Sequence, residues 1–131
     1  MLEIKNLFCG YQGIDIIRDL SLRAEPGEVL CIVGPNGCGK TTLLKSIARI
    51  ILYRGKIILD GREAASYSRK ELARRIALLG QNSELYFPYT VYDTVALGRY
   101  AHSRGFLKGL SREDDAVIGD ILQKLELYGE K

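Results

Sequence analysis

The stretch that decides the fold reads Val29-Leu30-Cys31-Ile32-Val33-Gly34-Pro35-Asn36-Gly37-Cys38-Gly39-Lys40-Thr41-Thr42. Its first five residues, 29–33, form a short apolar run that is typical of a strand buried on both faces of a parallel sheet. Residues 34–41 match the pattern G-x-x-x-x-G-K-[ST] at every fixed position. An amphipathic helix is expected to start near Gly39. The buried face expected for this helix consists of Leu43, Leu44, Ile47, Ala48 and Ile51.

This glycine-rich loop predicts a site for phosphate groups. Glycines let the backbone curl until successive N–H groups point at phosphate oxygens, and the positive end of the following helix adds to the attraction. Lys40 is expected to reach the β- and γ-phosphates, and the Thr41 hydroxyl is a hard oxygen ligand for Mg2+. We therefore predict binding of a nucleoside triphosphate, ATP with Mg2+. The nucleotide-binding residues predicted in this stretch are Gly34, Pro35, Asn36, Gly37, Cys38, Gly39, Lys40, Thr41 and Thr42.

Cys38 lies inside the loop and allows two interpretations. It is either a small residue that simply fits, or an activated thiol, because a helix N-terminus and a neighbouring lysine both favour the thiolate.

Composition places the chain among ordinary globular domains. Its 131 residues suit one domain, 47% are hydrophobic and 27% charged, and the net charge of +3 is too small to indicate nucleic-acid binding. Three cysteines at irregular spacing indicate neither a zinc site nor a disulfide framework, and free thiols fit a reducing compartment. The N-terminus lacks the features of a signal peptide, and no apolar run approaches the roughly 20 residues that span a bilayer. We expect a cytoplasmic chain that is not itself embedded in a membrane.

The rest of the chain alternates between strand and helix patterns. Apolar runs and turn signals predict strands at 2–8, 14–23, 56–60 and 76–79, with Gly10 and Gly13 forming the first turn. Helices are expected at 68–75, at 91–97 and after a capping box formed by Ser111 and Asp114, with a loop at 101–110. The apolar face expected for the last helix consists of Val117, Ile118, Ile121, Leu122 and Leu125. This alternation indicates an α/β fold with a largely parallel sheet and two antiparallel N-terminal strands.

Three features together resemble the ATPase subunit of ATP-binding-cassette (ABC) transporters. They are Tyr11 in the hairpin before the loop, the sequence of residues 34–42, and Gln81 after the apolar run 76–79. The resemblance covers nearly the whole chain. It implies a P-loop NTPase core with a partial parallel sheet, an N-terminal antiparallel β addition and the start of a helical subdomain. Residues 1–131 would then be the N-terminal portion of a nucleotide-binding domain.

The resemblance assigns a role to two residues outside the loop. Tyr11 matches the aromatic residue that stacks on adenine, although a tyrosine that merely covers the hairpin remains possible. Gln81 matches the residue that begins the Q-loop, whose amide contacts Mg2+ and the attacking water and links the site to the membrane subunit. The alternative for Gln81 is a polar residue at the end of a strand.

Residues 88–100 resemble the corresponding stretch of importers for iron-siderophore, haem or vitamin B12. In such importers this region lies where the helical subdomain meets the permease. The resemblance therefore implies integral-membrane permease subunits and a second ATPase subunit as partners, at the inner face of the cell membrane. The tyrosines of this region can also be read as ordinary, partly buried aromatic residues; they are Tyr86, Tyr89, Tyr92 and Tyr100.

Three motifs of a complete ABC ATPase are absent from the sequence: the signature, the Walker B strand and the switch histidine. Residues 57–60 imitate Walker B, but Gly61 stands where the catalytic glutamate belongs and the segment precedes Gln81. His102 is the only histidine, and it lies in an expected loop where no residue with which it could form a catalytic pair can be identified. We therefore assign no catalytic residue and expect the chain alone to bind nucleotide but to hydrolyse it poorly. The missing strands would lie beside the P-loop strand, so apolar edges should face solvent.

Two alternatives stay open at this point. One is a soluble ABC protein that acts on ribosomes or DNA, which the lack of a strongly basic face disfavours. The other is a truncation that folds only in part.

Overall fold

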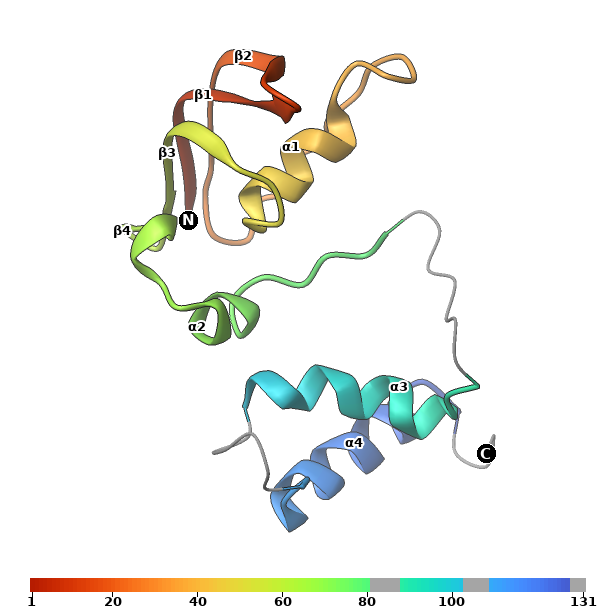
Figure 1. Cartoon of the computed structure of the whole chain (residues 1–131). Helices are drawn as coiled ribbons and strands as arrows, with labels where there is room; N and C mark the ends of the chain where they lie inside the picture. The colour runs from red at the N-terminus through yellow and green to blue at the C-terminus, as the bar shows by residue number, and fades with distance from the viewer. Residues whose placement is uncertain (81–87, 103–108, 128–131) are drawn as a thin grey trace. The chain divides into compact units, whose positions relative to one another are not determined.

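The computed structural model describes residues 1–80, 88–102 and 109–127, which divide into two compact units (Figure 1). The first unit is Met1–Leu78 and the second is Leu79–Lys131. The elements of the first unit are β1 (Leu2–Tyr11), β2 (Ile14–Ala24), α1 (Lys40–Ile47), β3 (Tyr53–Leu59), β4 (Arg62–Glu63), the 3-10 turn η1 (Ala64–Ser66) and α2 (Arg69–Ala73). The second unit contains α3 (Val91–Leu97), the 3-10 turn η2 (Gly98–Ala101) and α4 (Arg112–Lys124).

The sheet of the first unit has the strand order β2-β1-β3-β4, and every pair in it is antiparallel. The β1–β2 hairpin turns at Gln12 and Gly13, whose φ angles of 50° and 79° are the positive values that two-residue hairpin turns require. The expected role of Gly10 in this turn was wrong, because Gly10 lies within β1. A Cβ at Gly10 would lie 1.8 Å from the carbonyl oxygen of Ile14, so the residue permits close pairing of the two strands instead.

The core of the first unit forms where α1 packs against β1 and β2. Its buried residues are Ile4, Leu7, Cys9, Leu43, Ile57 and Ala64. Leu43 is buried as predicted, and Ile51 packs against this core although α1 ends at Ile47. Leu44 departs from the prediction and is 41% exposed, because the sheet covers only the side of the helix that carries Leu43.

The expected strands at 29–33 and 76–79 do not form in the described part of the chain. Neither segment has the hydrogen bonding of a strand, and Val29, Val33 and Leu79 are 93%, 87% and 90% exposed. An apolar run becomes a strand only when a neighbouring strand satisfies its backbone groups, and no described strand lies beside either segment. The parallel part of the sheet is therefore absent from these residues, and the expected exposed strand edges do not form there either, although apolar residues of both segments face solvent.

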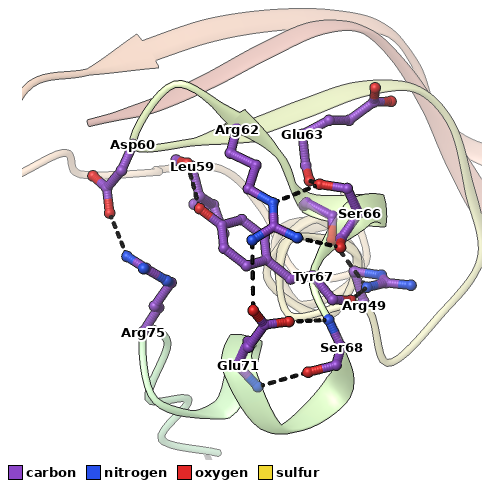
Figure 2. Close-up of polar contacts among 11 residues, drawn as sticks. Arg49, Leu59, Asp60, Arg62, Glu63, Ser66, Tyr67, Ser68, Glu71 and Arg75 are labelled. Atoms are coloured by element: carbon purple, nitrogen blue, oxygen red, sulfur yellow. Dashed lines mark hydrogen bonds and ion pairs between the residues drawn. The ribbon is translucent and has the colours of Figure 1, made fainter.

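Tyr67 organises the connection between β3 and α2 (Figure 2). Its ring lies under the guanidinium groups of Arg62 and Arg75, at 4.3 and 5.1 Å from the ring centroid, and its hydroxyl donates to the carbonyl oxygen of Leu59 at 3.1 Å. Cation–π contacts of this kind add to the burial of the ring. Helix α2 then starts at a capping box formed by Ser68 and Glu71, which agrees with the helix expected at 68–75.

The second unit is a pair of helices, α3 and α4, that pack through Ala96, Ile118 and Leu122. The capping box predicted for Ser111 and Asp114 is present. Leu125 was expected on the buried face but is 58% exposed, because α4 ends one residue earlier. Among the described residues, no helix combines the length and the hydropathy needed to cross a membrane.

Two side-chain contacts join α4 to the chain before it. The hydroxyl of Tyr92 donates to the carboxylate of Asp115. Arg99 forms an ion pair with Asp114 at 2.8 Å, with both side chains largely buried. Asp114 also accepts hydrogen bonds from the backbone N–H and the hydroxyl of Ser111, and these bonds together with Arg99 lower its pKa from 3.8 to about 2.

Candidate functional site

The loop of residues 34–39 leads directly into α1. Gly37 and Gly39 have φ angles of 82° and 101°, which side-chain-bearing residues rarely adopt. Gly39 is the N-cap residue, and helix hydrogen bonding begins with the N–H of Leu43 donating to its carbonyl at 2.9 Å. A glycine cap has no side chain to satisfy the first-turn N–H groups, so these donors remain available to an anion.

Lys40 turns back over the loop. Its Nζ donates to the carbonyl oxygens of Gly34 at 2.7 Å and Pro35 at 2.8 Å, and it lies 3.8 Å from the Sγ of Cys38. An ammonium group has three hydrogens, so two of them hold the group in place and the third makes only a weak contact with sulfur. The positive charge is thereby held above the loop.

Two glycines of the loop allow close packing. A Cβ at Gly34 would lie 2.7 Å from the Sγ of Cys38, so a larger residue at this position would require the Cys38 side chain to move. A Cβ at Gly39 would lie 2.7 Å from Cδ1 of Ile17 and 2.9 Å from Cγ2 of Ile16. The β1–β2 hairpin is therefore pressed against the start of α1. Sequence reasoning missed this contact, because nothing in the pattern of β2 marks these isoleucines as neighbours of the loop.

Tyr11 is the last residue of β1, and it pairs with Ile14 across the turn. Its side chain is 43% exposed. Tyr11 thus belongs to the hairpin that packs on the loop through Ile16 and Ile17, and it keeps an open surface on which a flat ring system could stack.

The two threonines after Lys40 lie in the first turn of α1 and differ in exposure. Thr41 is exposed, whereas Thr42 is buried at 6%. Mg2+ prefers oxygen ligands and retains several of its waters, so one accessible hydroxyl next to bound phosphates fits this ion. The second predicted ligand, Gln81, lies outside the described residues, and the structure does not test its pairing with Thr41.

All three cysteines are free thiols. Cys9 is buried in the core, whereas Cys31 and Cys38 are exposed. The thiol of Cys38 is thus accessible at the loop, which both of its interpretations allow.

The importer-like stretch falls in the second unit and is described in part. Tyr89, Tyr92 and Tyr100 are 45%, 39% and 66% exposed, which makes them more accessible than ordinary core aromatics. Tyr86 lies outside the described residues, as does most of the expected loop at 101–110. His102 is exposed at the end of η2.

Comparison with known proteins identifies the family to which this chain is similar. Residues 17–131 match the family model described as "ABC transporter". The chain is 41% identical over 128 residues to "Hemin import ATP-binding protein HmuV" of Pseudomonas fluorescens, covering 97% of this chain and 48% of that protein. It is 38% identical over 117 residues to "Ferric enterobactin transport ATP-binding protein FepC" of Escherichia coli, covering 88% of this chain and 43% of that protein.

A solved structure is similar over the same extent. A chain described as "Structure of ATP binding subunit of ABC transporter" superposes with a TM-score of 0.75 at 26% identity, covering 97% of this chain and 51% of that chain. The similarity confirms the α/β fold class predicted from the sequence. The present chain spans about half the length of the relatives that it matches.

Proposed function

This chain belongs to the ABC transporter family, and from that premise we propose that it is the ATP-binding portion of an importer ATPase. Residues 1–131 would form the N-terminal portion of the nucleotide-binding domain. They carry the phosphate-binding loop of residues 34–41, known as Walker A, and the glutamine of the Q-loop, Gln81. They do not carry the signature, Walker B or switch-histidine motifs.

The observation that carries the proposal is the position of Lys40. Two loop carbonyls hold its ammonium group against the loop that leads into the N-terminus of α1. Such an arrangement attracts a polyanion through charge and through directed hydrogen bonds. Phosphate oxygens of Mg·ATP would replace the weak sulfur contact, Thr41 and Gln81 would supply oxygen ligands to Mg2+, and Tyr11 would stack on adenine.

The test is the affinity of Lys40→Ala for Mg·ATP. We expect the dissociation constant to rise by at least about tenfold, since a charge-assisted hydrogen bond is lost. Nucleotide at 100 times its dissociation constant stabilises a native state by about 2.7 kcal/mol, and a tenfold weaker variant at the same concentration gains only about 1.4 kcal/mol. The melting shift of the wild-type chain should therefore fall by about half or more in the variant.

Lys45→Ala is the matched control, because it removes a lysine from the last turn of the same helix. Its Mg·ATP affinity should equal that of the wild-type chain. Unchanged affinity in Lys40→Ala would contradict the proposal.

We further propose that the solute is a metal chelate, namely an iron-siderophore, haem or cobalamin. The names of the relatives support the first two, since they concern import of hemin and transport of ferric enterobactin. The ATPase would act as a homodimer on integral-membrane permease subunits, at the inner face of the membrane. Co-purification with a membrane permease would support the importer assignment. Co-purification with ribosomes or DNA would favour a soluble ABC protein instead.

Hydrolysis by this chain alone should be slow. Phosphoryl transfer needs a residue that orients the attacking water and stabilisation of charge on the γ-phosphoryl group. The residues present supply Lys40, the loop amides and a ligand for Mg2+, which account for binding. Turnover of ATP by the purified chain at about one per second, the low end of ordinary enzyme rates, would refute this expectation.

A further inference from the structure

Arg49 has an unusual backbone conformation just after α1. The helix ends at Ile47 with Ala48 as its C-cap, and Arg49 follows with a φ of 54°. Glycine is the usual residue at this position, because a side chain in the left-handed region costs free energy. The conformation is therefore held by the surrounding structure, and the side chain of Arg49 takes part in it.

The contacts of this side chain are visible in Figure 2. The Nη1 of Arg49 donates to the carbonyl oxygens of Ala64 at 2.9 Å and Tyr67 at 2.7 Å. These carbonyls lie at the two ends of the η1 turn, and hydrogen bonds from a guanidinium group are stronger than those between neutral groups. Arg49 therefore ties the end of α1 to the connection between β4 and α2.

The η1 turn is itself firmly held. The hydroxyl of Tyr67 donates to Leu59 at the end of β3, and Arg62 of β4 donates to the hydroxyl and the carbonyl of Ser66. A hydrogen bond to this turn therefore also links α1 to β3 and β4. The helix otherwise rests on β1 and β2 through a single face, with Leu43 buried in the core.

We propose that Arg49 is a positioning residue for nucleotide binding: it fixes the C-terminal end of α1 so that Lys40 and the first-turn amides at the other end stay aligned with the phosphates. The eight-residue helix is only about 12 Å long and moves as a rigid rod, so a shift at one end is transmitted to the other. The inference rests on the proposed function, since it assigns a role within the same site.

Three substitutions separate this role from a merely local one. Arg49→Gly and Arg49→Asn both suit the left-handed conformation and remove the guanidinium group. Arg49→Lys keeps a positive charge and hydrogens that can reach the same carbonyls. We expect the dissociation constants of Mg·ATP and Mg·ADP to rise by about tenfold in the first two variants. The affinity for adenosine should stay within about twofold, and Arg49→Lys should recover most of the loss.

Asp19→Gly is the matched control. Asp19 has a φ of 50°, and its carboxylate accepts a hydrogen bond from Asn6 at 2.8 Å, within the β1–β2 pair. This variant also relieves a left-handed residue and deletes one side-chain contact in the same unit, but its affinity for Mg·ATP should remain that of the wild-type chain.

The outcomes are distinguishable. Unchanged Mg·ATP affinity in both Arg49→Gly and Arg49→Asn would overturn the inference while leaving the proposed function intact. An equal loss of adenosine and Mg·ATP binding, with a large drop in melting temperature, would also overturn it and show general destabilisation. A wild-type chain that does not bind Mg·ATP would overturn the proposed function and this inference with it.

Discussion

At the scale of single residues, the candidate site depends on glycines where an added side chain would strain the backbone or displace a neighbour. Gly39 combines a φ of 101° with less than 3 Å between a Cβ and two isoleucine side chains of β2. Gly34 leaves room for the sulfur of Cys38. The sequence pattern explains these glycines by the close approach of phosphate groups. The packing adds a second reason, because neighbouring protein side chains occupy the space that a Cβ would need.

Gly39→Ala should therefore destabilise the first unit even without nucleotide. We expect a loss of about 2–3 kcal/mol in the free energy of unfolding, from the left-handed backbone and the clash with Ile16 and Ile17. Urea denaturation measures this change. Gly119→Ala is the control, because Gly119 lies within α4 with nothing within 4 Å of its added Cβ and should gain about 0.5–1 kcal/mol. A loss below about 0.5 kcal/mol in Gly39→Ala would contradict the packing argument.

Alkylation of Cys38 should block binding of Mg·ATP, and bound nucleotide should protect the thiol. A bulky group on this exposed sulfur would fill the space over Gly34 and separate Cys38 from the Nζ of Lys40. The experiment is best done in a Cys31→Ser background, because Cys31 is also exposed whereas Cys9 is buried. Mass spectrometry then reports the label on Cys38. Equal labelling with and without nucleotide would count against contact between the ligand and this residue.

At the scale of elements, every expected helix formed, whereas the expected strands at 29–33 and 76–79 did not. The capping boxes at Ser68, Thr90 and Ser111 satisfy helix N–H groups with side chains three residues away, so short-range sequence determines where these helices start. The run 29–33 has the apolar character of a strand, but its pairing depends on partners far along a chain. The expected parallel strands therefore failed, while the hairpin, whose turn is local, was found.

The start of α4 should be sensitive to acid. The hydrogen bonds from Ser111 and the ion pair with Arg99 hold the pKa of Asp114 at about 2, below the ordinary 3.8. A group whose pKa is lowered by folding stabilises the native state above its unfolded pKa and loses that contribution as the pH falls through its folded pKa. The second unit should thus lose stability as the pH falls from about 3.8 towards 2.

Circular dichroism of α4 helicity against pH checks this expectation. Asp114→Asn is the control, because the amide cannot titrate and the acid-dependent step assigned to this residue should disappear. The same step persisting in Asp114→Asn would assign the titration to another carboxylate.

At the scale of the whole molecule, several large apolar side chains of the described residues are almost fully exposed. The most exposed apolar residues of the described ranges are Val29, Val33, Leu52 and Leu79. The sequence led us to expect apolar surface facing solvent, but as the edges of strands, and the segments that contain Val29, Val33 and Leu79 form no strand. The loop of the candidate site was predictable because its pattern is contiguous, whereas the neighbouring hairpin and the Arg49 anchor arise only from tertiary packing.

Val29→Lys should reduce self-association of the purified chain. The side chain of Val29 is 93% exposed, so a lysine there costs no core packing and adds charge to an exposed apolar segment. We expect the protein concentration at which light scattering rises to increase by roughly twofold or more. Gln123→Lys adds the same charge at an exposed position of α4 and should have a smaller effect. Equal effects of the two substitutions would attribute the change to net charge.

The tether between Lys40 and the two loop carbonyls has a consequence for recognition. A long cationic side chain in water samples many rotamers. A ligand that immobilised it on binding would lose affinity, because the side chain would lose conformational entropy. Here the freedom is already lost when the chain folds. An incoming polyanion meets a charge of fixed position, so selectivity should depend on the number and placement of its negative oxygens more than on movement of the loop around it.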